Sequence, residues 1–257
     1  MPVIDALGRS FDFPSPPQRV VSLVPSVTET LFDLGAGDTV VGITDFCIFP
    51  GKLDRPRVGG TKKPDIEAIR ALQPDLVHMN LEENIKRHAR AIEAFAPVFV
   101  SEPKSVRDVI GLISTLGAIH GASARAAEFV RAIEAELANM PRDPFTFACP
   151  IWKKPWMWCG GDTYVSDLVS CAGGENVMAS QKRYPVMTLD QLAALQPQIV
   201  FLPDEPYAFT QAEGRTIEER VDCRTIGPFP GHYFTWHGTR TVKGLRFLRE
   251  MMARARP

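Results

Sequence analysis

Two stretches of the chain repeat one pattern of hydrophobic and polar positions. Residues 65–79 read DIEAIRALQPDLVHM and residues 188–202 read TLDQLAALQPQIVFL, an offset of 123 residues (188 − 65). In each stretch, apolar residues recur at helical spacing up to a proline, and a short apolar run without alternation follows. Such a run is typical of a parallel strand that is buried on both faces. The pattern therefore predicts one helix–strand unit that occurs twice.

The segments before each copy carry a second echo. LGAGDTVVG (34–42) and CAGGENVMA (171–179) place glycines where a helix ends, and a strand is predicted over Val40–Ile43. Two helix starts carry the capping-box pattern, in the pairs Ser26 with Glu29 and Thr188 with Gln191. Because strands alternate with helices in both halves, we predict an α/β fold of two lobes with mainly parallel sheets.

The longest uninterrupted helical stretch lies between the two halves. Residues 123–140 read SARAAEFVRAIEAELANM, and PRDP (141–144) ends the helix. A single long helix of this kind would hold two lobes at a fixed separation. We therefore expect an N-terminal lobe over residues 1–121, a bridging helix and linker over 122–143, and a C-terminal lobe over 144–257.

Composition and charge exclude several classes of protein. The chain has 257 residues, of which 45% are hydrophobic and 23% charged, values that are ordinary for a globular protein and unlike a disordered one. The formal net charge of −1 lacks the basic excess of a nucleic-acid-binding or anionic-membrane-binding surface. No apolar run approaches the roughly 18–20 residues that span a bilayer.

The N-terminal residues and the cysteine spacing predict the cellular compartment of the protein and the redox state of its thiols. Asp5, Arg9 and Asp12 lie where a signal peptide would need its apolar core, so we expect a cytoplasmic protein as the chain is written, or a periplasmic one if a leader precedes it. The five cysteines are scattered, odd in number and without a CxxC pair. This spacing predicts reduced thiols rather than a disulfide framework or a structural zinc site.

A series of motifs resembles a known family. RVVSLVPSVTETLFDLG, RVGGTKKPDIEAIRALQPDLV, the long helix, GGDTYVSDLVSCAGGENV and TLDQLAALQPQIVFLPDEPY occur in that order. Together they resemble the helix-bridged (class III) solute-binding proteins of ABC importers, in particular the cobalamin-binding and helical backbone metal receptor proteins. The resemblance covers about residues 11–207. It implies a ligand cleft between the two lobes and little hinge motion on binding.

The same resemblance suggests a partner. In these importers one acid on the outer surface of each lobe meets arginines of the permease, and Glu67 and Asp190 match that pattern. Each acid also falls in the first turn of its predicted helix, where the helix dipole favours negative charge by about 0.3–1 kcal/mol. Both explanations stay open for the two acids.

Ligand-binding residues are predicted after the repeated strands, because ligands of parallel α/β sheets bind outside the carboxyl ends of the strands. In the first lobe these residues are Glu82, Glu83 and Asn84, and in the second they are Asp204, Glu205 and Tyr207. The 123-residue offset makes Glu82 and Glu205 equivalent. These acids would bind a cation or accept hydrogen bonds from ligand amides; the alternative is that they are solvated loop carboxylates or helix caps.

Aromatic residues are the second group of candidates. Trp152, Trp156 and Trp158 lie within eight residues, and Trp236 and Arg240 lie in FTWHGTR near the C-terminus. Tryptophan offers a large rigid face on which flat ligands stack, although the same residues also pack in cores. Arg240 would anchor a ligand carboxylate or phosphate, unless it is an ordinary surface charge.

No catalytic motif is present, and metal ligands are sparse. The chain lacks GxSxG, a P-loop and a GxGxxG that opens a helix, so we assign no catalytic residue. The five histidines form no close pair in the sequence, and His78 in its apolar strand is expected to be a hydrogen-bonded core residue. The one metal set that the cleft acids allow is Glu82 and Glu205 with His237 or Cys47.

These observations predict a solute-binding protein and not an enzyme. We expect a monomer that captures a corrinoid such as cobalamin, or another metal chelate, for delivery to an ABC permease if the protein is exported. The alternative is a cytosolic metal-binding protein or metal-dependent enzyme on the same scaffold, with a divalent metal ion as its ligand. A macrocycle stacked on tryptophans would distinguish the first from a bare ion on carboxylate and imidazole.

Overall fold

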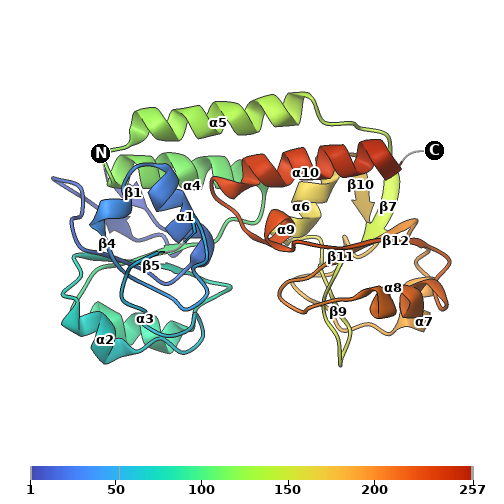
Figure 1. Ribbon diagram of the computed structural model, residues 1–257, viewed down its shortest axis with the longest axis horizontal. Coiled ribbons are helices and arrows are strands. Elements are labelled where there is room, and N and C mark those ends of the chain that lie inside the picture. The colour runs from blue at the N-terminus through green and yellow to red at the C-terminus, as the bar shows by residue number, and fades with distance from the viewer. Residues whose placement is uncertain (1, 52, 256–257) are drawn as a thin grey trace. The chain divides into compact units, whose positions relative to one another are not determined.

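The computed structural model describes residues 2–51 and 53–255, and in it the chain divides into two compact units. The first unit comprises residues 1–103, 108–132 and 238–240, and the second comprises 104–107, 133–237 and 241–257, apart from the residues that the structure does not describe. Each unit contains one four-stranded parallel sheet (Figure 1). The α/β fold with parallel sheets that the sequence predicts is therefore confirmed.

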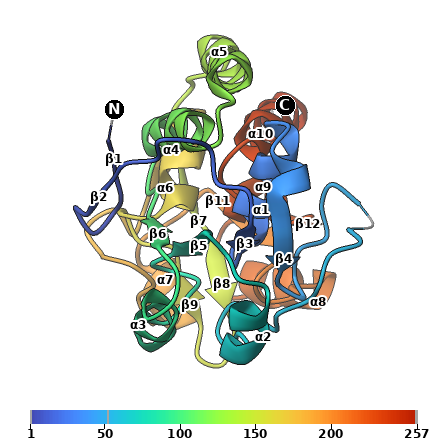
Figure 2. The same ribbon diagram turned by 90° about the vertical axis from the view of Figure 1, so that its left-hand side faces the viewer.

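The sheet of the first unit has the strand order β4-β3-β5-β6. These strands span Val40–Ile43, Val20–Ser22, Leu76–Asn80 and Val98–Ser101, respectively. The helices α2 (Ile66–Ala71) and α3 (Lys86–Glu93) lie on one face, and α1 (Pro25–Asp33) and α4 (Val106–Ile119) lie on the other (Figure 2). Successive residues of β5 serve the two faces, because Val77 packs with Ile69 and Ile92 while Leu76 packs with Ile119.

The sheet of the second unit has the strand order β10-β7-β11-β12. These strands span Gly174–Asn176, Phe145–Ala148, Ile199–Pro203 and Arg224–Phe229. The helices of this unit are α6 (Tyr164–Ser170), α7 (Leu189–Ala193), α8 (Gln211–Glu218), α9 (His232–Thr235) and α10 (Arg240–Ala255). An antiparallel hairpin, β8 (Pro150–Trp152) with β9 (Met157–Trp158), directly follows β7.

The two sheets share one topology. Numbered along the chain within each sheet, both have the order 2-1-3-4, and the bounds of β5 and β11 differ by 123 residues (199 − 76). The repeat in the sequence is thus a repeat of architecture. In both sheets the chain order reverses between the first and third strands, which is the place where ligands of doubly wound sheets bind.

The predicted long helix is present as α5 (Ser123–Ala138). The boundary between the two units falls inside it, between Ala132 and Ile133. The chain also passes between the units near residues 104–107 and 238–240.

The helix caps in the structure agree with those predicted from the sequence in all but one case. Thr188 and Gln191 form both hydrogen bonds of a capping box, and Asp65 accepts from the backbone N–H of Ala68 at the start of α2. The capping box predicted for Ser26 and Glu29 is wrong, because α1 begins at Pro25 and has no side-chain cap. Proline at the first helical position supplies no N–H to cap, and Glu29 is drawn instead into an ion pair with Arg240.

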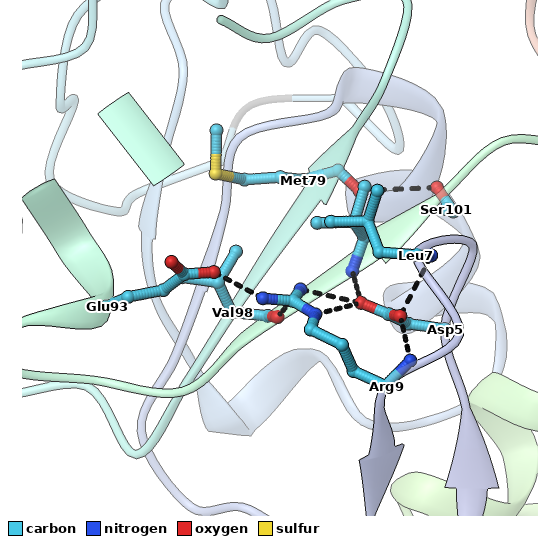
Figure 3. A network of polar contacts seen from close by, with 8 residues as sticks. Asp5, Leu7, Arg9, Met79, Glu93, Val98 and Ser101 are labelled. Atoms are coloured by element: carbon cyan, nitrogen blue, oxygen red, sulfur yellow. Dashed lines mark hydrogen bonds and ion pairs between the residues drawn. The ribbon is translucent and has the colours of Figure 1, made fainter. Parts of the chain in front are cut away.

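A polar network attaches the N-terminal hairpin of β1 (Val3–Ile4) and β2 (Ser10–Phe11) to the edge strand β6 (Figure 3). Ala6 donates its backbone N–H to the carbonyl of Val100 at 2.9 Å. Arg9 donates two hydrogen bonds to Asp5 and one to the Val98 carbonyl, at 2.6–2.9 Å. Burial opposes ionisation of Asp5, yet the Arg9 hydrogen bonds outweigh it and the pKa of Asp5 lies below its usual value. The hairpin thus covers an otherwise open sheet edge.

Candidate ligand-binding site

The loop after β5 in the first unit is closed by two buried asparagines. Asn80 accepts the backbone N–H groups of Glu82 and Glu83, and Asn84 accepts that of Asn80 at 2.8 Å. The Asn84 amide also donates to the carbonyls of Leu23 and Thr61 at 3.1 and 3.0 Å. Asn84 therefore shapes the loop from within, while Glu82 and Glu83 remain partly accessible.

Three exposed apolar side chains, which were not among the residues predicted from the sequence, follow strands of the first unit. Phe46, Ile48 and Leu81 are 58%, 52% and 40% exposed, and they follow the carboxyl ends of β4 and β5. Phe46 lies against Gly60, where a Cβ atom would stand 3.2 Å from its ring. Water-exposed apolar residues at the end of a parallel sheet are typical of a binding surface. Only Leu81 carried a signal in the sequence, as an apolar residue directly after a buried strand.

The second unit carries an aromatic cluster, which we define as Trp152, Trp156, Trp158, Tyr207 and Phe209. The ring centroids of neighbouring members are 4.7–5.9 Å apart, in the order Trp152, Tyr207, Phe209, Trp156, Trp158. Its members come from the β8–β9 hairpin and from the loop after β11. The fold therefore joins two segments that the sequence analysis proposed separately, and it adds Phe209.

The members of the aromatic cluster differ in access to water. Trp152 is 43% exposed, Tyr207 and Trp156 are half-buried, and Phe209 is buried. Trp158 is completely buried, and its indole N–H donates to the carbonyl of Met187 at 2.9 Å. Trp158 thus supports the cluster from the core and offers no face to a ligand, whereas Trp152 is exposed and Tyr207 and Trp156 are partly accessible.

A lysine lies beside the aromatic cluster. Lys153 Nζ is 5.9 Å from the centroid of the Trp156 ring and 2.7 Å from a carboxylate oxygen of Glu213. The hydrogen bond from Lys153, helped by that from Thr210, lowers the pKa of Glu213 to about 2. This pair holds Lys153 in place at the edge of the aromatic surface.

Polar contacts fix the start of the loop after β11. Asp204 accepts the backbone N–H of Gly231 at 2.6 Å, and Glu205 accepts the indole N–H of Trp236 at 3.1 Å. Only glycine fits at position 231, since a Cβ atom would lie 2.6 Å from the backbone nitrogen of Glu205. Trp236 is therefore a partner of Glu205, and its half-buried ring lies beside His232.

Three other predicted residues occupy buried positions. Arg240 donates two hydrogen bonds of 2.6 Å to Glu29 and lies 3.7 Å from the Phe49 ring centroid. Its guanidinium is thus engaged inside the protein, and the expectation that it anchors a ligand acid finds no support. Burial lowers the pKa of His237 to about 4, and burial raises the pKa of Cys47, whose thiol contacts Thr28 and Thr44.

The geometry of the described residues does not support the predicted metal site of Glu82 and Glu205 with His237 or Cys47. Within residues 2–51 and 53–255, no group of three His, Cys, Asp or Glu side chains is placed to hold a metal ion. His78 is a buried core residue, as expected, and its Nε2 lies 2.9 Å from that of His120.

Comparison with known proteins then identifies the family. The sequence profile of the periplasmic binding proteins matches residues 20–219. The chain belongs to this family. A relative in Bacillus subtilis, the ABC transporter substrate-binding lipoprotein YvrC, is 24% identical over 96% of this chain and 83% of its own length. The vitamin B12-binding protein of Vibrio campbellii is 28% identical over 72% of this chain and 70% of its own.

Solved structures show the same fold. The periplasmic vitamin B12-binding protein BtuF of Vibrio cholerae superposes with a TM-score of 0.80 at 21% identity, covering 94% of this chain and 99% of its own. The periplasmic heme-binding protein RhuT from Roseiflexus has a TM-score of 0.74 at 21% identity, with the same coverage. These relatives are named as binding proteins, so the alternative of a metal-dependent enzyme is not favoured.

Glu67 and Asp190, for which the resemblance implies contact with a permease, are both exposed. The side chain of Glu67 is 80% exposed and that of Asp190 is 76% exposed. Each lies near an arginine of its own unit, Glu67 at 3.5 Å from Arg70 and Asp190 at 3.2 Å from Arg220. In the described part of the chain, no helix is both long and apolar enough to span a membrane.

Proposed function

We propose that this chain is the solute-binding protein of an ABC importer and that its ligand is a corrinoid or another bulky metal chelate. The observation that carries the proposal is the aromatic cluster at the strand ends of the second unit, in which Trp152 is exposed and Tyr207 is half-buried. A flat macrocycle stacks on such faces, and each stacked aromatic contributes about 1–3 kcal/mol. The names of the relatives, which bind vitamin B12 or heme, support this ligand class.

The charged and apolar residues near the strand ends suggest how other parts of the ligand would be bound. Lys153 is the positive group beside the aromatic surface and would meet an acidic substituent of the ligand. Glu82 and Glu205 would accept hydrogen bonds from ligand amides. Phe46, Ile48 and Leu81 offer further exposed apolar side chains after the strands β4 and β5 of the first unit.

Tryptophan fluorescence tests the proposal directly, because all four tryptophans lie in the second unit. Titration with cyanocobalamin and with hemin, corrected for their absorbance and repeated by calorimetry, should show saturable quenching with one of them. Trp152→Ala should weaken binding by about 5–150-fold, the equivalent of ~1–3 kcal/mol. Leu195→Ala is the matched control, since Leu195 is 40% exposed but follows helix α7 instead of a strand.

Two outcomes would refute this function. Absence of saturable binding to any member of a panel of corrinoids, hemes and iron chelates removes the ligand class. Equal affinities of Trp152→Ala and Leu195→Ala for a bound chelate remove the aromatic cluster from the site.

We propose further that Glu67 and Asp190 dock the permease. Reversing both charges (Glu67→Lys with Asp190→Lys) should abolish association with the permease and uptake while ligand affinity stays unchanged. Glu128→Lys is the control, because Glu128 pairs with Arg125 three residues away as Glu67 does with Arg70. Undiminished uptake by the double variant contradicts this assignment.

This function places the protein outside the cytoplasmic membrane, in agreement with relatives described as periplasmic or as a lipoprotein. Fractionation of cells that express the complete native gene tests the location. Recovery of all the protein in the cytosol rules out both export and docking.

A further inference from the structure

Two buried cysteines face each other at the base of the β8–β9 hairpin. Cys149 immediately precedes β8, and Cys159 immediately follows β9. Pro150 pairs with Trp158, and the backbone N–H of Cys159 donates to the carbonyl of Cys149 at 2.8 Å. This register makes the two cysteines direct cross-strand neighbours, and both are fully buried.

The geometry of such a pair suits a covalent bond. Directly opposed residues of antiparallel strands have Cα atoms about 4.5–5.5 Å apart, which falls within the roughly 4.4–6.8 Å that a disulfide spans. The Cys149 thiol donates to the carbonyl of Pro150 at 3.8 Å, and the neighbouring Cys159 thiol together with burial raises the pKa of Cys149. Side chains of directly opposed residues stand on the same face of a hairpin, so the two thiols are neighbours.

The other three cysteines have different surroundings. Cys47 contacts the hydroxyls of Thr28 and Thr44, and it belongs to the first unit. Cys171 and Cys223 are half-buried, and they follow α6 and α8.

We propose that Cys149 and Cys159 form a disulfide when the protein folds in an oxidising compartment, and that this bond staples the hairpin that carries Trp152 and Trp156. The oxidant is a protein or small-molecule disulfide. One cysteine thiolate attacks it to form a mixed disulfide and releases one oxidant thiol. The second cysteine then attacks the mixed disulfide, so that the Cys149–Cys159 bond forms and a second oxidant thiol leaves. The protons of the two cysteine thiols balance those taken up by the two released thiols.

The bond has a definite consequence for stability. It closes a loop of about eleven residues, and the loss of chain entropy in the unfolded state corresponds to about a 100-fold shift in the unfolding equilibrium toward the folded form. The equivalent rise in Tm is about 5–10 °C. Because both thiols are buried, exchange takes place during folding and is slow once the unit has folded.

The full chain tests this inference without any ligand. It is refolded in a mixture of oxidised and reduced glutathione, alkylated with N-ethylmaleimide under denaturing conditions and weighed intact. Wild-type protein should carry three alkyl groups, whereas protein refolded with a reductant should carry five. Trypsin cuts after Lys153, which separates the two cysteines into the peptides 143–153 and 154–182.

The second peptide also contains Cys171, and variants resolve this ambiguity. The cross-linked peptide pair should persist in Cys171→Ser and disappear in Cys159→Ser. Five alkylated thiols after oxidative refolding of the wild type, or a link that survives in Cys159→Ser, overturns the proposal. An equal Tm for the oxidised and reduced wild type overturns the stapling role.

Discussion

Mild acid should destabilise the first unit through the buried pair His78 and His120. Their Nε2 atoms are 2.9 Å apart, and Nδ1 of His120 is buried with no hydrogen-bond partner among the described residues. Burial lowers the pKa of His120 to about 4, against a smaller opposing effect of Asp75. Burial and the neighbouring His120 also place the pKa of His78 well below its usual value.

The sign of the effect follows from where the protons bind. An unfolded histidine titrates near 6.5, whereas the folded His120 titrates near 4, so the unfolded state binds the proton more tightly. The stability is therefore complete above pH 6.5 and is lost as the pH falls from 6.5 toward 4. For His120 alone, the loss between pH 7.5 and pH 5 is about 2 kcal/mol.

Urea unfolding followed by far-ultraviolet circular dichroism at pH 7.5 and pH 5 measures this loss. Between pH 7.5 and pH 5 the histidines titrate but carboxylates such as Asp5 and Glu213 do not, because the pKa values of these carboxylates lie below this range. His120→Asn should lower stability at pH 7.5 and remove about 2 kcal/mol of the loss at pH 5. His88→Asn is the comparison: burial and Arg87 also lower the pKa of His88, but this side chain is only half-buried, so the variant should remove a smaller part of the loss. Equal stability of the wild type at the two pH values, or the full loss in His120→Asn, would refute the reasoning.

Three substitutions test other contacts, each by chemical denaturation. Arg240→Ala removes the bidentate partner of the buried Glu29 and should lower the free energy of unfolding by about 3–5 kcal/mol. Adding Glu29→Gln removes the unpaired buried charge and should restore part of that free energy. If it restores none, the ion pair is not the cause of the loss. Asp65→Ala removes the cap of α2 and should cost about 1 kcal/mol, whereas an unchanged midpoint would show that the cap contributes nothing. Gly238→Ala should destabilise by more than about 1 kcal/mol, because Gly238 has φ = +81° and a Cβ atom would clash with Thr30; a neutral effect would contradict this backbone geometry.

The repeat and the local helix signals were legible in the sequence because they depend on neighbours along the chain. Periodicity and the proline after each helix predicted both helix–strand units, and the strands β5 and β11 lie at the predicted 123-residue offset. Asp65 and Thr188 cap their helices as their sequence neighbours indicate. The position of candidate residues after these strands also followed, because the carboxyl ends of parallel strands share one edge.

Contacts between segments that are distant in the sequence determine which side chains are buried, which are paired and which stay exposed. Glu29 and Arg240 are 211 residues apart, so no local pattern shows that they bury each other's charge and that α1 lacks its predicted cap. Trp158 and Trp152 lie in one short stretch with the same chemistry, yet the loop after β11 and the backbone of Met187 place the first in the core while the second stays open to water. Burial is a property of the packed chain, and only the packed chain determines which aromatic face remains for a ligand.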